Sequence, residues 1–273
     1  MGRQPIERAW FLTTGTLGSP GVALGIPAGV LGLGLVRLPI AVLVLEHRGG
    51  DVTLVDTGWS AEQCRTPLRS LGPATALFLS VKAQAGDDAA AQLRARGIEP
   101  TRVTTIIATH LHNDHVGGLV DFPNAEVVTT ERELGSARER GVVHGFDVDA
   151  LAKVGRWTLR TIDGPSRFEM PASTQLSDDL VLLDVRGHTA GTIAVAATLG
   201  NHTLVHVGDA AYTLGEARRG EQSLLAQRTT FDLERQKTTY RAIDRLLARE
   251  NVTVLTSHDP TVWPSLEGRV WTR

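Results

Sequence analysis

The stretch His110-Leu111-His112-Asn113-Asp114-His115 carries four side chains that can bind a metal ion. It follows the apolar, β-branched run 103–108, which predicts a buried strand. Residues two apart in an extended backbone point the same way, so His110 and His112 can bind one metal together. Asp114 and His115 lie past the strand end, where a turn can direct them to a second metal. The sequence therefore predicts a binuclear site.

A structural zinc site is the main alternative for this stretch. Such sites are usually rich in thiolates and closed to solvent. The chain has one cysteine, Cys64, which lies far from the stretch in sequence. Imidazole and carboxylate ligands suit catalytic zinc, iron or manganese instead. The residue types favour a catalytic centre.

Further candidate ligands follow three later strand-like runs. The runs 181–185, 203–207 and 252–256 lead into loops that hold His188, Asp209 and His258 respectively. Each residue alone is weak evidence, because turn aspartates and loop histidines are common. Their repeated position after a β-rich run indicates one shared site.

On these residues the chain resembles the metallo-β-lactamase superfamily. The family's His-x-His-x-Asp-His motif stands at 110–115, and its strand ending in Asp-Thr-Gly matches 53–58. The resemblance spans residues 40–260 and implies an α/β fold, a four-layer αβ/βα sandwich with two mixed β-sheets packed face to face and helices outside. It also implies a ligand set: His110, His112 and His188 for one metal, Asp114, His115 and His258 for the other, with Asp209 bridging both.

Composition sets the broad class. The chain has 273 residues, which fits one large domain over 1–273, long enough to bury a substantial core. A formal net charge of −2 gives no electrostatic case for a nucleic-acid partner or an anionic membrane. A single cysteine allows no internal disulfide, and residues 1–8 do not resemble a secretion signal. We therefore expect a cytoplasmic protein, and a homodimer is compatible with the sequence.

Several segments have a predicted structure. Residues 61–71, 87–96 and 231–250 are predicted as helices, the last one amphipathic. The apolar, glycine-rich segment 21–36 is interpreted as a strand and loop near a sheet edge, with a flap that lines a greasy pocket as the alternative. Residues 215–228 are expected to form a loop or short helix near the site.

The predicted ligands determine the chemistry. We expect two divalent metal ions, with zinc as the first choice and iron, manganese or cobalt as alternatives. Two such ions share a water molecule and lower its pKa to about 7. They can present the resulting hydroxide and also polarise an oxygen of the substrate. This is machinery for hydrolysis of a carbonyl, phosphoryl or sulfuryl ester, and we expect no redox role and no organic cofactor.

Tyr212 lies three residues after Asp209 and can stabilise a developing oxyanion as a hydrogen-bond donor. A packing role under a loop is the alternative. Three motifs, Asp-Ala-x-Tyr-Thr at 209–213, His-Asn-Asp-His-Val-Gly-Gly at 112–118 and Ser-His-Asp at 257–259, resemble those of the N-acyl-homoserine lactonases of the superfamily, in which the matching tyrosine contacts the lactone. That resemblance implies a small-molecule lactone or ester as substrate, with Tyr212 orienting its carbonyl and Asp114 passing a proton to the leaving alkoxide.

Three other functions compete with this one. A thioester hydrolase of the glyoxalase II type uses the same seven ligands but usually continues into a basic helical region. A true β-lactamase generally lacks an aspartate that bridges both metals, so Asp209 counts against it. A non-catalytic binding protein would have little reason to keep all seven ligands.

The remaining histidines and the tryptophans receive supporting roles. His206 is expected in the core or behind the ligands, His144 in a loop over the pocket, and His47 and His202 in surface turns. Asp56 resembles the family's strand-end aspartate, which implies that it supports the site by hydrogen bonding and does not bind metal. Three tryptophans are either pocket walls or, as we favour, core residues: Trp10, Trp59 and Trp157.

Overall fold

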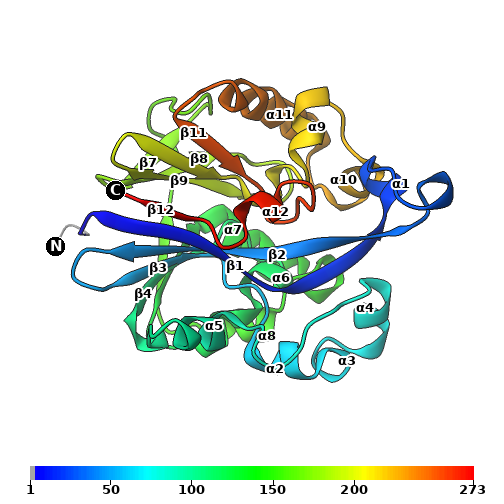
Figure 1. Ribbon diagram of the computed structural model, residues 1–273, viewed down its shortest axis with the longest axis horizontal. Helices are drawn as coiled ribbons and strands as arrows, with labels where there is room; N and C mark the ends of the chain where they lie inside the picture. The colour runs from blue at the N-terminus through cyan, green and yellow to red at the C-terminus, as the bar shows by residue number, and fades with distance from the viewer. Residues whose placement is uncertain (1–3) are drawn as a thin grey trace.

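The β-rich runs assemble into two sheets in the computed structural model (Figure 1). The structure describes residues 4–273, so the first three residues of the expected 1–273 domain lie outside it. The larger sheet has the order β12 (Val270–Thr272), β1 (Ile6–Pro20), β2 (Leu35–His47), β3 (Val52–Val55), β4 (Val103–Ile107), β5 (Glu126–Thr130) and β6 (Trp157–Arg160). The smaller sheet has the order β11 (Val252–Leu255), β10 (His202–His206), β9 (Ile193–Leu199), β8 (Leu180–Asp184) and β7 (Ser173–Ser177).

Both sheets are mixed. Strands β3 to β6 run parallel to one another, whereas β12, β1, β2 and β3 pair antiparallel. In the smaller sheet only β10 and β11 pair in parallel. Parallel strands place their carboxyl ends at one edge, so the loops after β3 and β4 emerge together, as those after β10 and β11 do.

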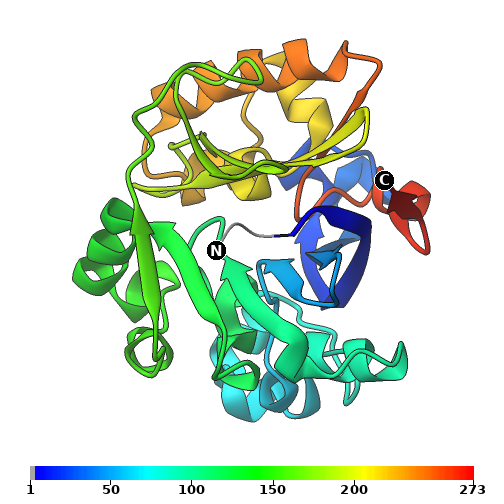
Figure 2. The ribbon, with the colours of Figure 1, turned by 90° about the vertical axis from the view of Figure 1, so that its left-hand side faces the viewer.

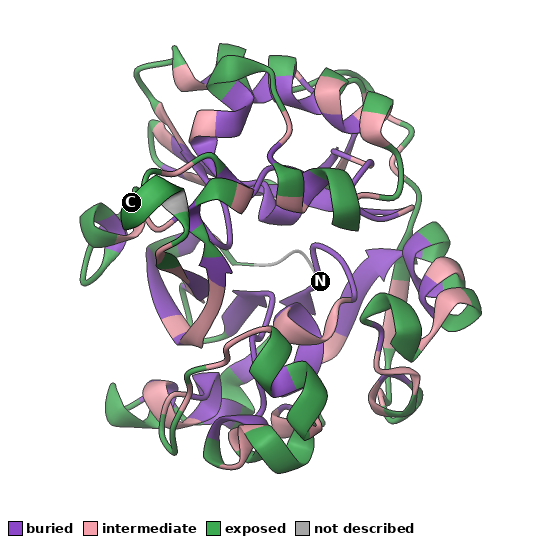
Figure 3. Ribbon diagram, turned by 90° about the vertical axis from the view of Figure 1, so that its right-hand side faces the viewer, coloured by how far each residue is buried: buried purple, intermediate pink, exposed green. Residues whose placement is uncertain are grey.

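The two sheets pack face to face with helices on the outer faces, which confirms the predicted four-layer sandwich. One apolar layer, which includes Leu43 and Ile107 from one sheet and Leu182 and Val195 from the other, lies between the sheets. Two further layers lie under the helices on either side. Figure 2 shows the long helix α11 (Leu233–Leu247) outside the smaller sheet. Buried residues concentrate on the strands and exposed ones on the outer helices (Figure 3).

The predicted helices differ from the observed ones mainly at their ends. Residues 61–71 form two helices, α2 (Ala61–Arg65) and α3 (Pro67–Ser70), because Thr66 precedes a proline and leaves the helical region. The helix predicted over 87–96 is α5 (Ala89–Ala95), which begins after the Asp88 cap. Asp232 likewise caps α11, so that helix is shorter than the predicted 231–250.

The segment 21–36 forms the tip of the long β1–β2 hairpin. It contains α1 (Gly21–Leu24) and the 3₁₀ turn η1 (Val30–Gly32), so the expected strand is confined to Leu35 and Val36, where β2 begins. Gly25, with a φ of 68°, ends α1 in the left-handed conformation. The expectation of a loop or short helix over 215–228 is met by α9 (Leu214–Arg219) and α10 (Leu224–Thr229).

The other helical elements are short connections. They are η2 (Pro100–Arg102), α4 (Pro73–Phe78), α6 (Asn113–Val116), η3 (Gly117–Asp121), α7 (Glu131–Arg140), η4 (Val142–His144), α8 (Val148–Ala152), η5 (Gly208–Ala210) and α12 (Trp263–Leu266). Across residues 4–273, no helix combines the length and the apolar character that a bilayer span requires.

Candidate metal centre

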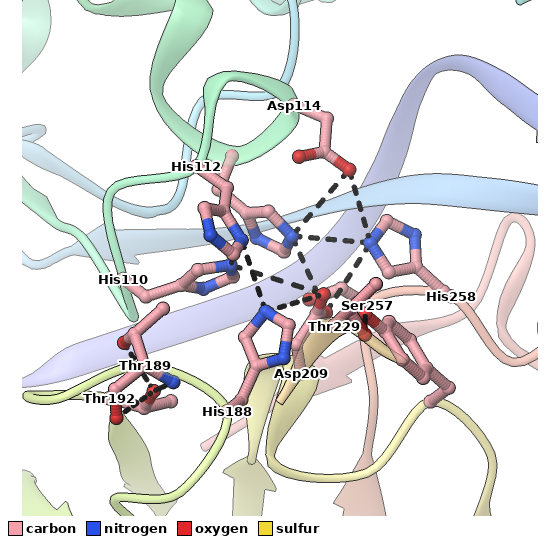
Figure 4. Close-up of polar contacts among 12 residues, drawn as sticks. His110, His112, Asp114, His188, Thr189, Thr192, Asp209, Thr229, Ser257 and His258 are labelled. Carbon is pink, nitrogen blue, oxygen red and sulfur yellow. Dashed lines mark hydrogen bonds and ion pairs between the residues drawn. The ribbon is translucent and has the colours of Figure 1, made fainter. Parts of the chain in front are cut away.

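Seven histidine and aspartate side chains converge where the loops of the two sheets meet (Figure 4). The larger sheet supplies the residues that follow β4, from His110 to the start of α6. The smaller sheet supplies His188 after β8, Asp209 in η5 after β10, and His258 after β11. All seven residues named from the sequence are therefore neighbours, although they span residues 110–258.

The first group of ring nitrogens belongs to His110, His112 and His188. His112 Nδ1 lies 3.1 Å from His110 Nε2 and 3.1 Å from His188 Nε2. Nitrogens bound at 2.0–2.1 Å to one tetrahedral zinc lie roughly 3.3 Å apart. His110 and His188 are buried and His112 is partly buried. The spacing and the donor type therefore fit one metal ion.

The second group consists of Asp114, His115 and His258. His115 Nε2 lies 3.2 Å from His258 Nε2, and Asp114 Oδ2 lies 3.4 Å from His258 Nε2 and 3.9 Å from His115 Nε2. The Asp114 side chain is 21% exposed, whereas the two histidines are almost fully buried. Asp114 is thus the member of this group that faces the approach from solvent.

Asp209 lies between the two groups. Its Oδ1 is 3.4 Å from His115 Nε2 and 3.3 Å from His258 Nε2. Its Oδ2 is 3.6 Å from His188 Nε2 and 3.9 Å from His110 Nε2. Oδ1 is buried and has no hydrogen-bond partner among the described residues. A buried carboxylate oxygen without a donor is costly, and a cation on each side of the carboxylate would compensate it.

Burial and charge divide the five histidines. Burial lowers the pKa of His112 to about 3 and that of His188 to about 4, and it lowers the pKa of His110 well below its usual range. Burial also opposes the charge on His258 and His115, yet the carboxylates of Asp209 and Asp114 outweigh it. They raise the pKa of His258 to about 10 and that of His115 well above its usual range. The first group is therefore neutral, the form in which imidazole binds metal.

Hydrogen bonds behind the ligands fix their orientation. Asp56 directly follows β3 and has a φ of 61°, a conformation that aspartate tolerates. Its carboxylate accepts from Thr109 N at 2.7 Å, Thr109 Oγ1 at 2.8 Å and His115 Nδ1 at 2.8 Å. His258 Nδ1 donates to Pro39 O at 2.7 Å. These two hydrogen bonds direct Nε2 of both histidines to the centre, as bonds to the outer nitrogen of a metal-binding histidine commonly do. The structure places Asp56 as the sequence suggested.

Tyr212 borders both groups. Its ring centroid lies 5.7 Å from that of His188 and 6.0 Å from that of His258. Burial and the nearby Asp209 raise the pKa of the phenol well above its usual range. Its hydroxyl is 2.8 Å from Thr229 Oγ1, which itself donates to Leu225 O. The single hydrogen of Thr229 is then used, so Tyr212 is the donor in this pair.

The hairpin tip lies beside this tyrosine. Leu24 of α1, Leu38 of β2 and Ala226 of α10 are buried together with Tyr212 in one apolar cluster. The segment 21–36 is thus placed beside the candidate centre, as the pocket-lining alternative requires. Sequence reasoning did not foresee the contact between Tyr212 and α10, because no local pattern links them.

Two buried glutamates were also missed. Glu133 in α7 accepts hydrogen bonds from Leu111 N, which lies between His110 and His112, and from Gly191 N, three residues after His188. Glu216 in α9 accepts from the backbone N–H of Tyr212 and from that of Ser223. The only signal in the sequence is the Thr/Ser-x-x-Glu spacing of a helix cap.

The remaining histidines divide between the interior and the surface. The expected surface position of His47 is wrong, because its Nδ1 donates to Gln4 O at 2.7 Å and its ring is buried at the end of β2. His202 is half-buried in β10 instead of in a turn. His206 is buried in the core as expected. His144 lies exposed in η4, next to the loop that borders His112.

The tryptophans are core residues. Trp10 and Trp59 are buried, and Trp157 packs against the same apolar layer as Trp10. The favoured core role is therefore confirmed over the pocket-wall alternative.

Comparison with known proteins agrees with the fold. A model of the metallo-beta-lactamase superfamily matches residues 35–258. The probable metallo-hydrolase Rv2300c of Mycobacterium tuberculosis is 29% identical, over 92% of this chain and 87% of that protein. The N-acyl homoserine lactonase AttM of Azorhizobium caulinodans is 27% identical, over 85% of this chain and 86% of its own. A solved structure of an N-acyl homoserine lactone hydrolase with bound N-hexanoyl-L-homoserine shares the fold, with a TM-score of 0.75 and 21% sequence identity. The match covers 96% of this chain and 97% of that one.

Proposed function

This chain belongs to the metallo-beta-lactamase superfamily, and from that membership we propose that it is a binuclear metal-dependent lactonase, with N-acyl-homoserine lactones or related lactones as substrates. It is a hydrolase related at low identity to proteins named N-acyl homoserine lactonases. The substrate class is our proposal.

One observation carries this function: the Asp209 carboxylate directs one oxygen to each ligand group. We assign His110, His112 and His188 to one divalent ion and Asp114, His115 and His258 to the other, with Asp209 shared. Zinc suits these nitrogen and oxygen ligands, and iron, manganese or cobalt are alternatives. When bound, two such ions make a nucleophile available from water near neutral pH and polarise a carbonyl oxygen.

The chain's own residues would then guide the substrate and the proton. Tyr212 keeps its proton at neutral pH and lies against His188 and His258, so a turn of its hydroxyl from Thr229 would direct a hydrogen bond to a lactone carbonyl. Asp114 is the most exposed member of its group, and its carboxylate would accept the proton that the attacking water gives up and pass it to the leaving alkoxide. These two residues are the proposed catalytic side chains.

The test compares two acyl substrates on the zinc- or cobalt-loaded protein. Release of acid from an N-acyl-homoserine lactone is followed beside hydrolysis of an S-acyl-glutathione thioester at the same enzyme concentration. Efficient turnover of the lactone alone is expected. Turnover of the thioester alone would overturn the lactonase proposal while leaving the metal centre in place, and it would indicate the glyoxalase II type of activity.

A further inference from the structure

Glu133 is a buried carboxylate that joins the two segments carrying the first group of ligands. It lies in the first turn of α7, its exposed fraction is 0%, and no cation forms an ion pair with it in the described part of the chain. Oε1 accepts from Leu111 N at 3.0 Å, and Oε2 accepts from Thr189 Oγ1 at 2.7 Å and Gly191 N at 2.9 Å. All three donors come from the loops that hold metal-ligand candidates.

The positions of these donors matter. Leu111 stands between His110 and His112 in the loop after β4, and Thr189 directly follows His188 in the loop after β8. β4 belongs to the larger sheet and β8 to the smaller one. The carboxylate therefore spans the two sheets at the point where the three imidazoles must meet.

A neutral amide cannot replace this carboxylate. Both oxygens of Glu133 accept, one from a single donor and the other from two. Glutamine would present an N–H₂ group to at least one N–H or O–H donor, which leaves that donor unpaired in the interior. A carboxylate satisfies all three donors, and this explains a buried charge that has no counter-ion in contact.

Close packing prevents the loop after His188 from shifting relative to Glu133. A Cβ atom added at Gly191 would lie 2.4 Å from Thr130 Oγ1 and 2.5 Å from Glu133 N, so the loop after His188 rests directly on the start of α7. Thr192 Oγ1 lies 2.6 Å from Thr189 Oγ1, which holds the hydroxyl that donates to Glu133 (Figure 4). These contacts thus fix the distance between the loop after β4 and the loop after β8.

We propose that Glu133 is a positioning residue that sets the spacing of His110 and His112 against His188 and thereby the affinity of that group for its metal. This role rests on the proposed metal centre. It does not extend to the group of Asp114, His115 and His258, whose histidines are oriented by the Asp56 carboxylate and by Pro39 O.

The test is an equilibrium titration of the apo full-length chain with zinc against a competing chelator, and with cobalt(II) followed by its absorption spectrum. Wild type is expected to bind two equivalents. Glu133→Gln should bind one equivalent with unchanged affinity and the other about 10- to 100-fold more weakly, the usual cost of losing an outer-shell partner. The spectrum of its tight site should match that of His188→Ala, which lacks a ligand of the first group.

Two controls separate positioning from stability. Asp179 is a nearly buried carboxylate at the far end of β8 that accepts from Ile6 N at 2.9 Å. Asp179→Asn should lower the melting temperature and leave both metal affinities unchanged.

If Glu133→Gln does not fold, Thr189→Val should show the same weaker binding of one zinc equivalent. Thr189→Ser should not, because serine keeps the hydroxyl.

Three results would overturn the role. Unchanged affinity for both equivalents in Glu133→Gln, with only a lower melting temperature, would make Glu133 a purely structural residue. Equal loss of affinity for both zinc equivalents would show that Glu133 does not act on the first group alone. If the wild-type chain bound no metal tightly, the proposed function itself would be overturned. This outcome can be told apart from failure of the Glu133 role because it is measured on the unmodified chain.

Discussion

The carboxylate of Asp56 accepts a hydrogen bond from His115 Nδ1 at 2.8 Å, with both side chains buried. Because a carboxylate only accepts, Nδ1 carries a ring proton, and in the neutral ring Nε2 is the nitrogen with the lone pair that can bind metal. The strand end that carries Asp56 thus determines which nitrogen of His115 faces the centre.

Asp56→Asn tests this relationship. Asparagine tolerates the positive φ of position 56, so the backbone should be retained while the charged acceptor is lost. We expect metal affinity at the group of Asp114, His115 and His258 to fall by about 10- to 100-fold. Chelator competition measures it, and affinity equal to wild type would contradict the orienting role.

Asp209→Ala removes the carboxylate between the two groups. Metal retention should fall and lactone turnover should drop to the background rate, because His110 and His188 would no longer share an acidic partner with His115 and His258. Elemental analysis after gel filtration, together with a turnover assay, tests this. Two full equivalents of metal with normal turnover would exclude the binuclear assignment.

Tyr212→Phe removes the phenol and keeps the ring that packs against Leu24 and Ala226. Metal content should stay unchanged, whereas kcat/KM for the lactone should fall by roughly 10- to 100-fold, as for one lost hydrogen bond of about 1.5–3 kcal/mol to a developing charge. The matched variant Thr229→Val keeps the phenol and should retain most of the turnover. An unchanged rate in Tyr212→Phe would leave the tyrosine with a packing role alone.

The thiol of Cys64 should be inert in the folded protein. Its exposed fraction is 0%, and burial raises its pKa to about 12. Thiolate, the reactive form, is therefore scarce at pH 8. Ellman's reagent should detect no thiol in the native chain at that pH and one thiol per chain after denaturation. Rapid labelling of the native chain would contradict this placement.

Local patterns made the sheets and the seven clustered side chains predictable. The β-branched run of β4 and the histidine spacing after it are encoded in adjacent residues. The break at Thr66 before Pro67 is also local, but the single helix predicted over 61–71 missed it. Glu133 was not predictable, because its three donors are distant in sequence and its own helix resembles a charged surface helix. His47 was misplaced for the same reason, since its partner Gln4 lies 43 residues away.

The hydrogen bond from His258 to Pro39 has a consequence for synthesis of the chain. The three imidazoles of the first group lie between residues 110 and 188, whereas the second group needs a histidine seventy residues later that donates a hydrogen bond to a strand near the start of the chain. During synthesis, all three imidazoles of the first group leave the ribosome before His258 is made. The complete set of seven side chains therefore requires β11 and the loop after it, close to the end of the described chain.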